Sequence, residues 1–446
     1  MLRLLFAIAI VLLPNALHVS MDTGIPGLNL SNLMLLLLVS ALLISRRETN
    51  PSLAAPGYLT APLIALFLTL AIAFGIAQWT GSSDLLADLT RLKNAIFYPA
   101  FYFVFRRCRL DLQATRQLIG LVLVVAVVAG LEAVYQGVQF GLGQYVADQR
   151  ASGPFGDVQM ANRAGVFYAF FLPMLAAAAV LMTRSRVLRL SAVGGCVVLA
   201  LAILLTYSRQ SYLIAAFGLL MLLMHLMRRK ALLAMVAGLM LLVSVGLFPD
   251  SVLQRVQDTR RVDGSGAATF DSSTASRFEI WDGAVAMWRD HPAGVGLGRF
   301  SRNIGDYSSY PGMDAHNSFV LMLAEAGPLG LAALLWVFWR LWGLARRLRE
   351  SAESTDLGAQ ALALGFKIAV VSVALSNLYG SPFFEGIIMA NFWVLCGLLE
   401  RYAILKAHPA GAFAEGTGPV TPPEIASRFP LAARAMPGLR TIPKSS

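Results

Sequence analysis

Residues 117–137 read QLIGLVLVVAVVAGLEAVYQG, a run of 21 residues with a single charged side chain, Glu132. A helix of about 20 mostly apolar residues is the length that crosses the hydrocarbon core of a bilayer. Hydrocarbon cannot satisfy open backbone groups, so such a run crosses as a helix. We therefore predict that this stretch is a membrane-spanning helix.

Comparable apolar runs recur along the whole chain. Of its 446 residues, 57% are hydrophobic and 14% are charged, whereas a soluble domain usually carries about 25% charge. This composition excludes an ordinary soluble enzyme, a disordered chain and a secreted domain built on disulfides. The sequence predicts an all-α polytopic membrane protein with about twelve transmembrane helices, at 2–18, 30–45, 59–79, 92–106, 117–137, 161–182, 190–207, 211–227, 231–248, 317–342, 359–378 and 385–403.

The spacing of these runs predicts four regions. Transmembrane helices 1–9 occupy residues 1–248, and a large loop covers 249–316. Transmembrane helices 10–12 occupy 317–403, and a flexible cytoplasmic tail rich in Pro, Gly and Ala covers 404–446.

The basic residues sort into two sets by the ends of the predicted spans. One set of flanks holds nineteen: Arg3, Arg46, Arg47, Arg106, Arg107, Arg109, Arg116, Arg184, Arg186, Arg189, Arg228, Arg229, Lys230, Arg340, Arg346, Arg347, Arg349, Arg401 and Lys406. The opposite short loops hold five: Arg91, Lys93, Arg150, Arg163 and Arg209. Because cytoplasmic loops carry the excess of Lys and Arg, both termini are predicted inside the cell and the 249–316 loop outside, in the periplasm of a Gram-negative cell.

This sorting also accounts for the net charge of +11. In a soluble protein that charge would suggest nucleic-acid binding, but here most of it marks the cytoplasmic face. A nucleic-acid binder is therefore excluded. The five outward cations are candidates for binding phosphates of an anionic lipid, against the alternative that they are ordinary snorkelling side chains at span ends.

The outward loop contains an amphipathic helix pattern, SRFEIWDGAVAMWRDHP, over residues 276–292. Ser276 and Glu279 have the spacing of a capping box at a helix start. The apolar side chains from Ile280 to Trp288 fall on one stripe, and His291-Pro292 ends the helix. The helix is predicted to lie on the membrane surface or over the bundle.

The sequence GVGLG follows at residues 294–298. A dinucleotide site would need a preceding strand and a following helix in a βαβ unit, and neither is predicted. We interpret this run as a flexible turn that returns the chain to the membrane.

Two ionisable residues mark the end of the loop and the tenth span. His316 precedes a helix N-terminus, where free N–H groups and the helix dipole favour an anion. Glu325 lies two to three turns into the span, where an ionisable group is costly and functional by default. The alternatives are a satisfied interfacial histidine and a glutamate that hydrogen-bonds inside the bundle.

Two spaced motifs resemble the O-antigen ligase family, which belongs to the group of O-antigen ligases, polysaccharide polymerases and protein O-oligosaccharyltransferases. The first is R-x3-L, from Arg209 to Leu213, and the second is H-N-x9-G-x-x-G, from His316-Asn317 to Gly327 and Gly330. The stretch from Ser276 through Arg277, Trp281, His291-Pro292 and Gly294 to Gly298, and IPGLNLSN at 25–32, are similar to the same group. The resemblance covers nearly the whole chain.

The resemblance implies the membrane-embedded glycosyltransferase fold, GT-C. It implies transfer of a glycan from undecaprenyl diphosphate to an acceptor outside the cytoplasmic membrane, without ATP, metal or other cofactor. Carried over by motif, Arg209 and Arg277 would grip the donor diphosphate and His316 would be the catalytic histidine, with Asn317, Glu325, Gly327, Gly330 and Leu213 as motif support.

The residue types suit that chemistry. The planar, always charged fork of arginine matches phosphate oxygens, and a histidine within hydrogen-bond reach can take a proton from an acceptor hydroxyl. The substrate diphosphate is expected to contact Arg209 and Arg277, helped by Lys93 or Arg163, with Arg91 and Arg150 as further candidates. The outward acids Asp263, Asp271, Asp282 and Asp314 are scattered, so no metal site is predicted.

Four functions remain open at this point. An O-antigen ligase that uses lipid A–core sugar of lipopolysaccharide is favoured by the paired motifs. A polymerase would use a second lipid-linked glycan as acceptor, and an oligosaccharyltransferase would use a Ser or Thr of a protein. The fourth is a small-solute transporter of the bicarbonate type, which the absence of a convincing internal repeat disfavours.

Overall fold

The computed structural model describes residues 2–16, 18, 29–45, 50–81, 85–141, 146, 148–182, 185–226, 260–262, 268–270, 272–353 and 355–407. The helices are α1 (Leu2–Leu12), α2 (Leu30–Ile44), α3 (Pro51–Ala54), α4 (Thr60–Trp79), α5 (Leu85–Arg106), α6 (Leu112–Phe140), η1 (Gly153–Phe155), η2 (Val158–Met160), α7 (Ala161–Leu181), α8 (Arg186–Leu205), α9 (Arg209–Leu226), α12 (Ser272–Asp290), α13 (Phe300–Asn303), η3 (Ile304–Asp306), α14 (Ser318–Glu350), α15 (Leu357–Ser376), η4 (Pro382–Phe384) and α16 (Gly386–Ala407). Two short strands, β1 (Arg260–Val262) and β2 (Ala268–Phe270), pair antiparallel.

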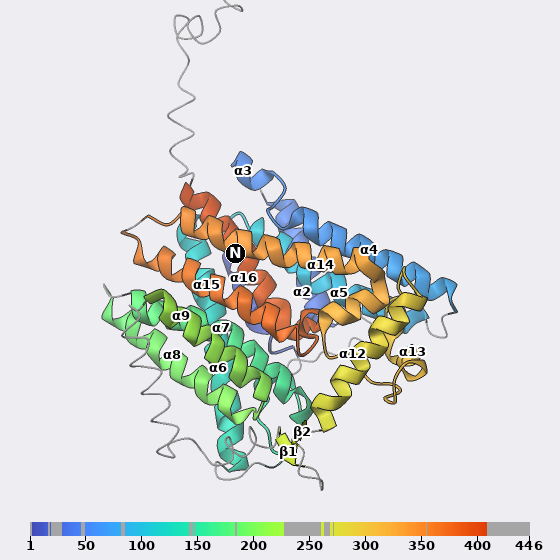
Figure 1. Cartoon of the computed structure of the whole chain (residues 1–446). Helices are drawn as coiled ribbons and strands as arrows, with labels where there is room; N and C mark the ends of the chain where they lie inside the picture. The colour runs from blue at the N-terminus through green and yellow to red at the C-terminus, as the bar shows by residue number, and fades with distance from the viewer. Residues whose placement is uncertain are drawn as a thin grey trace, which may run out of the picture.

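Seven helices among the described residues are long and apolar enough to cross a membrane. They are α4, α6, α7 with the preceding η2, α8, α14, α15 and α16, and each coincides with a predicted span. The protein is therefore a polytopic helical membrane protein, as the sequence predicts. The chain packs as one helical bundle, with α14, α15 and α16 running through its middle (Figure 1).

Burial divides these helices into a centre and a rim. In α7 and α16, 78% and 89% of the apolar window is buried inside the protein, whereas in α8 the figure is 28%. The rim helices expose large apolar side chains, among them Leu68, Val187 and Leu190. A soluble protein rarely leaves so continuous an apolar surface open to water, so this rim is the surface expected to face lipid.

The predicted count of twelve spans is not established by the described helices. The first predicted span, 2–18, contains the 11-residue helix α1, which ends before Pro14. Proline disfavours a helical conformation for the residue before it, which accounts for the early end. The second, α2, has 15 residues, and the predicted span 231–248, like the tail after 407, lies outside the described residues.

Helices α5 and α14 run in the same direction and separate the two predicted sets of basic residues. Arg91 lies in the second turn of α5, and Arg106 is its last residue. His316 lies just before α14, and Arg347 is in its last turn. The bundle therefore has two chemically different ends, called below the His316 end and the Arg347 end.

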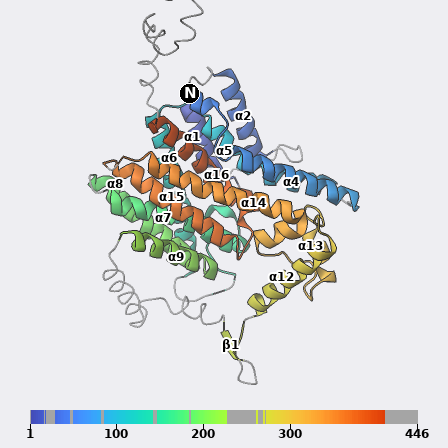
Figure 2. The same cartoon turned by 45° about the horizontal axis from the view of Figure 1, so that its top comes forward.

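The predicted loop 249–316 holds α12 and α13, which lie next to the start of α14 at the His316 end (Figures 1 and 2). The predicted amphipathic helix is present, and it ends at Asp290, just before His291-Pro292. Its stripe of Ile280, Ala284 and Met287 is buried against residues of the 295–315 segment and of α14. This helix therefore covers the bundle.

The predicted capping box is wrong. Helix α12 begins at Ser272, so Ser276 lies in its second turn and does not cap it. The Glu279 carboxylate instead accepts a hydrogen bond of 2.8 Å from the backbone N–H of Ser309. Glu279 therefore bonds to Ser309, outside the helix, and not to the start of the helix as the local pattern predicts.

Candidate functional site

His316 occupies a constrained backbone position at the entrance to α14. Its φ of 46° lies in the left-handed region, which residues other than glycine adopt rarely. The next residue, Asn317, caps α14 by accepting from the N–H groups of Phe319 and Val320, at 2.9 and 3.2 Å. On the other side, the Trp281 indole of α12 donates to the Ala315 carbonyl at 2.8 Å. Packing from α12 and the helix cap together fix the histidine.

The start of α14 is also bonded to the end of α15. The Ser318 N–H donates to the Asn377 carbonyl at 2.9 Å, and the Ser318 hydroxyl donates to the Asn377 side-chain oxygen at 2.6 Å. Asn377 is buried and also accepts from the N–H of Phe383. The loop between α15 and α16 is therefore part of the site's framework.

The surroundings of His316 favour its neutral imidazole, chiefly through burial. Burial lowers the pKa of His316 below its ordinary value, and the Arg277 and Arg163 guanidiniums lower it further, while the Asp314 carboxylate opposes them. The Nδ1 atom lies 3.8 Å from Asp314 Oδ2, and the side chain remains 39% exposed. A neutral, accessible imidazole beside two cations can accept a proton.

This environment predicts the acid side of the pH–activity profile. If His316 acts as a base, activity depends on its unprotonated form, so kcat/KM should fall only below about pH 6.5, the ordinary histidine pKa. Removing the Asp314 charge with Asp314→Asn should move this acid limb to lower pH, because the carboxylate raises the histidine pKa. The titration would be assigned to another group if the acid limb of the profile stayed in place in Asp314→Asn, or if it lay above pH 7.

Two arginines approach His316 from different helices. The Arg277 guanidinium of α12 lies over the Tyr379 ring, 3.7 Å from its centre. The Arg163 guanidinium of α7 pairs with the Glu385 carboxylate at 2.6 Å. Both act electrostatically on His316, so the structure brings two of the predicted cations to the histidine.

Arg209 lies at the same end of the bundle. It is the first residue of α9, and the side chain of the next residue, Gln210, donates to the Ser376 carbonyl at 2.7 Å. Ser376 precedes Asn377, which holds the start of α14, so α9 and α14 meet the same end of α15. Leu213, the other fixed residue of the R-x3-L motif, is 72% exposed on the rim, which is expected of a lipid-facing side chain.

The remaining predicted cations have defined local partners. Arg91 donates to the Gly298 carbonyl at 3.0 Å, and Arg150 donates to the Thr206 carbonyl at 2.8 Å and also bonds to Asn162. Lys93 lies 6.0 Å from the centre of the Phe97 ring. Arg91 and Arg150 thus anchor loops at the His316 end, a role that the positive charge alone does not predict.

The GVGLG run is a buried, bonded segment, so the prediction of a flexible turn is wrong. Helix α14 is broken at Gly327, with φ 66° and ψ −168°, and continues through Pro328. Proline has no N–H, so the carbonyl four residues earlier, of Ala324, lacks its helical donor. The Val295 N–H donates to this carbonyl at 2.9 Å, and the Gly296 N–H donates to the Glu325 carbonyl at 3.0 Å.

The same segment packs against α4 on its other side. The Leu297 N–H donates to the Ala73 carbonyl at 3.0 Å. A Cβ on Gly296, at φ 98°, would lie 2.6 Å from the backbone nitrogen of Ala77. Glycine is therefore required here both for the positive φ and for the close backbone approach. We refer to residues 294–298 as the glycine segment.

Glu325 of α14 bonds to the segment that follows the glycine segment, and it lines a cavity. Its buried carboxylate accepts from the Phe300 N–H at 3.1 Å. With Arg91 and Asp314 it lines a cavity of about 300 Å³ between α4, α5, the glycine segment and α14. The alternative interpretation, a glutamate hydrogen-bonded inside the bundle, is confirmed. A functional role for Glu325 stays a prediction, beside a cavity that Asp314 also lines.

Several residues of this framework carry no signal in the sequence. A buried bidentate ion pair joins Arg299 to Asp88, with N–O distances of 2.6 and 3.0 Å, and Gln78 also donates to Asp88. Glu385 and Asn377 also escape prediction, since each is an isolated polar residue between apolar spans. Only the fold shows that Glu385 meets Arg163 of α7 and that Asn377 meets Ser318 of α14.

The part of the chain that the structure describes contains no group of three or more His, Cys, Asp and Glu side chains placed to hold a metal ion.

A known family model matches part of the chain. Residues 194–335 match the model of the O-antigen ligase family. No curated protein matches the chain. The matched residues run from α8 to the middle of α14 and include Arg209, Arg277 and His316.

Proposed function

We propose, from the premise that residues 194–335 belong to the O-antigen ligase family, that the protein transfers a lipid-linked glycan to lipid A–core at the His316 end. The family supports a ligase or polymerase type of activity on lipid-linked glycans. The proposed donor is a glycan on undecaprenyl diphosphate, and the proposed product is lipopolysaccharide that carries the glycan.

One observation carries the proposal. His316 stands in a constrained, half-exposed position where Arg277 and Arg163 act on it, next to a carboxylate. A glycosyl transfer from a diphosphate needs cations for the leaving group and a base for the acceptor hydroxyl. The arginines of α7 and α12 and the histidine before α14 are the residues proposed to supply them.

The proposed reaction is a single displacement that inverts the anomeric carbon. The acceptor hydroxyl oxygen bonds to the anomeric carbon as the bond from that carbon to the diphosphate oxygen breaks, and His316 takes the hydroxyl proton. Arg209 and Arg277 hold the departing diphosphate, helped by Lys93 or Arg163. No metal, ATP or other cofactor takes part.

The proposal includes a topology. The twelve predicted spans, the GT-C type of fold, the location in the bacterial inner membrane and a periplasmic His316 end are expectations of the same account. The sorting of basic residues to the Arg347 end supports this orientation through the positive-inside rule.

A deletion strain tests the ligase proposal against its alternatives. Loss of the gene should leave lipopolysaccharide without long chains while the lipid-linked polymer accumulates, and the wild-type gene should restore the chains. Single repeat units on the core would point to a polymerase, and loss of glycan from a protein to an oligosaccharyltransferase. Unchanged glycans with altered solute uptake would contradict the proposal in favour of a transporter.

A further inference from the structure

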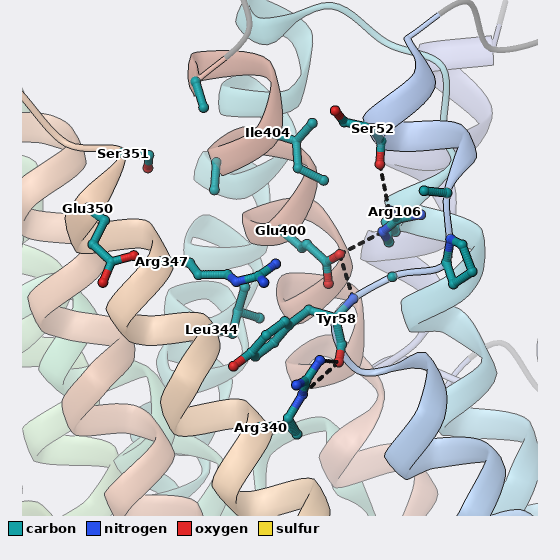
Figure 3. A pocket seen from close by; sticks show the side chains of 15 residues that line it. Ser52, Tyr58, Arg106, Arg340, Leu344, Arg347, Glu350, Ser351, Glu400 and Ile404 are labelled. Carbon is teal, nitrogen blue, oxygen red and sulfur yellow. Dashed lines mark hydrogen bonds and ion pairs between the residues drawn. The ribbon is translucent and has the colours of Figure 1, made fainter.

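A second cavity lies at the Arg347 end of the bundle. It has a volume of about 590 Å³ and lies between the loop before α4, the end of α5 and the last turns of α14 and α16. Figure 3 shows its labelled side chains, with Arg340 and Arg347 extending from α14 toward Tyr58. The proposed glycan transfer uses none of these residues.

Two guanidiniums converge on one aromatic ring in this cavity. The Arg340 and Arg347 guanidinium carbons lie 3.5 and 3.9 Å from the centre of the Tyr58 ring. Arg340 also donates two hydrogen bonds to the Tyr58 carbonyl, at 3.0 and 2.8 Å. Neither arginine forms an ion pair with a carboxylate of the described residues. Glu350 also lines the cavity, so besides Glu400 one further carboxylate faces the two guanidiniums.

The Glu400 carboxylate, which also lines the cavity, is already bonded to three groups of the protein. Glu400 pairs with Arg106 at 2.8 Å, and it accepts from the Tyr58 N–H at 2.8 Å and the Tyr102 hydroxyl at 2.5 Å. Figure 3 shows Glu400 turned toward Arg106. Its charge is therefore neutralised within the protein, and it opposes a bound anion less than a free carboxylate would.

The wall of the cavity is amphipathic. Leu344, Ala403 and Ile404 line it next to the arginines and the Ser52 hydroxyl. A ligand that fits both surfaces has an anionic head with hydrogen-bond acceptors and an apolar part. Arginine forks match phosphate oxygens in particular.

The cavity is separate from the His316 site. Arg340 lies 22 residues after the start of α14, and a helix rises about 1.5 Å per residue, which gives on the order of 30 Å. That is about the thickness of the hydrocarbon core. A ligand here therefore lies at the opposite membrane surface from the proposed transfer reaction.

We propose that this cavity binds a phosphate-bearing group at the membrane surface, with the phosphodiester of an anionic phospholipid as its source. Arg347 and Arg340 contact the phosphate, and the apolar wall receives the start of an acyl chain. The bound lipid bridges α14, α16 and the loop before α4, and stabilises this end of the bundle.

The test measures the thermal unfolding of the purified full-length protein in detergent micelles against added phosphatidylglycerol or inorganic phosphate. Phosphatidylglycerol should raise the Tm of the wild type saturably. Arg347→Gln should weaken its apparent affinity roughly tenfold, the factor for a charge-assisted hydrogen bond of about 1.4 kcal/mol. Arg347 suits this test because its side chain donates no hydrogen bond to the described residues. Arg340→Lys is a second, conservative variant expected to weaken affinity less.

The matched control is Arg346→Gln, an exposed arginine one residue away that does not line the cavity. Its affinity should equal that of the wild type. A saturable Tm rise with inorganic phosphate alone, lost in Arg347→Gln, would assign the phosphate site to a free ion. Absence of a saturable rise in both arms, or equal losses in Arg346→Gln and Arg347→Gln, would overturn the proposal.

Discussion

Replacing His316 with asparagine should reduce glycan transfer by about 10²- to 10⁴-fold, the usual contribution of a general base. Asparagine tolerates the left-handed backbone that His316 adopts, so the entrance to α14 should keep its conformation while the base is lost. His316→Ala should be equally inactive. In a deletion strain complemented with either variant, long chains on lipopolysaccharide should be absent although the protein is present in the membrane.

The matched control is His225→Ala, which removes an exposed histidine near the far end of α9. This variant should restore long chains as the wild type does. Substantial transfer by His316→Asn would sink the assignment of His316 as the base. Equal loss in His225→Ala would show that removing a histidine disturbs the protein in a general way.

The second large effect is expected at the glycine segment. Gly296→Ala should destabilise the protein by about 1–2 kcal/mol from the positive φ and by about 1–3 kcal/mol more from the contact with Ala77. To relieve this contact the glycine segment must move away from α4, which weakens its hydrogen bonds to the broken turn of α14. Both the Tm in micelles and glycan transfer should fall.

Gly312→Ala separates these two causes. Gly312 has a φ of 79° but nothing within 4 Å of an added Cβ, so only the backbone term applies, and the variant should keep most of its transfer activity. If Gly296→Ala lost no more Tm and transfer activity than Gly312→Ala, the close packing against α4 would not be needed for transfer. The glycine segment would then be a turn of the kind that the sequence pattern suggests.

The spans were predictable because membrane crossing has a local requirement, a run of apolar residues of fixed length. Helices α4, α6, α7, α8, α14, α15 and α16 all follow such runs. The break in α14 was not predicted, although Gly327 and Pro328 adjoin in the sequence. A Gly-Pro step is tolerated in a spanning helix when another segment satisfies the freed carbonyls, and here that segment comes from a distant loop.

The candidate site shows the same limit. His316, Arg277 and Arg163 stand out in the sequence because they are polar residues of the predicted outer side. Asn377 and Glu385 do not, because their roles depend on contacts with α14 and α7 that no local pattern encodes. The capping box failed for this reason as well, since Glu279 finds its partner at Ser309, 30 residues away.

The most direct test of the proposed function is transfer by the purified protein in lipid vesicles supplied with an undecaprenyl-diphosphate-linked glycan and lipid A–core. Wild-type protein should convert lipid A–core to a species of lower gel mobility and release undecaprenyl diphosphate, without nucleotide or added metal, and His316→Asn should do neither. Unmodified lipid A–core in the wild-type reaction, with a donor that a second ligase consumes in parallel, would contradict it.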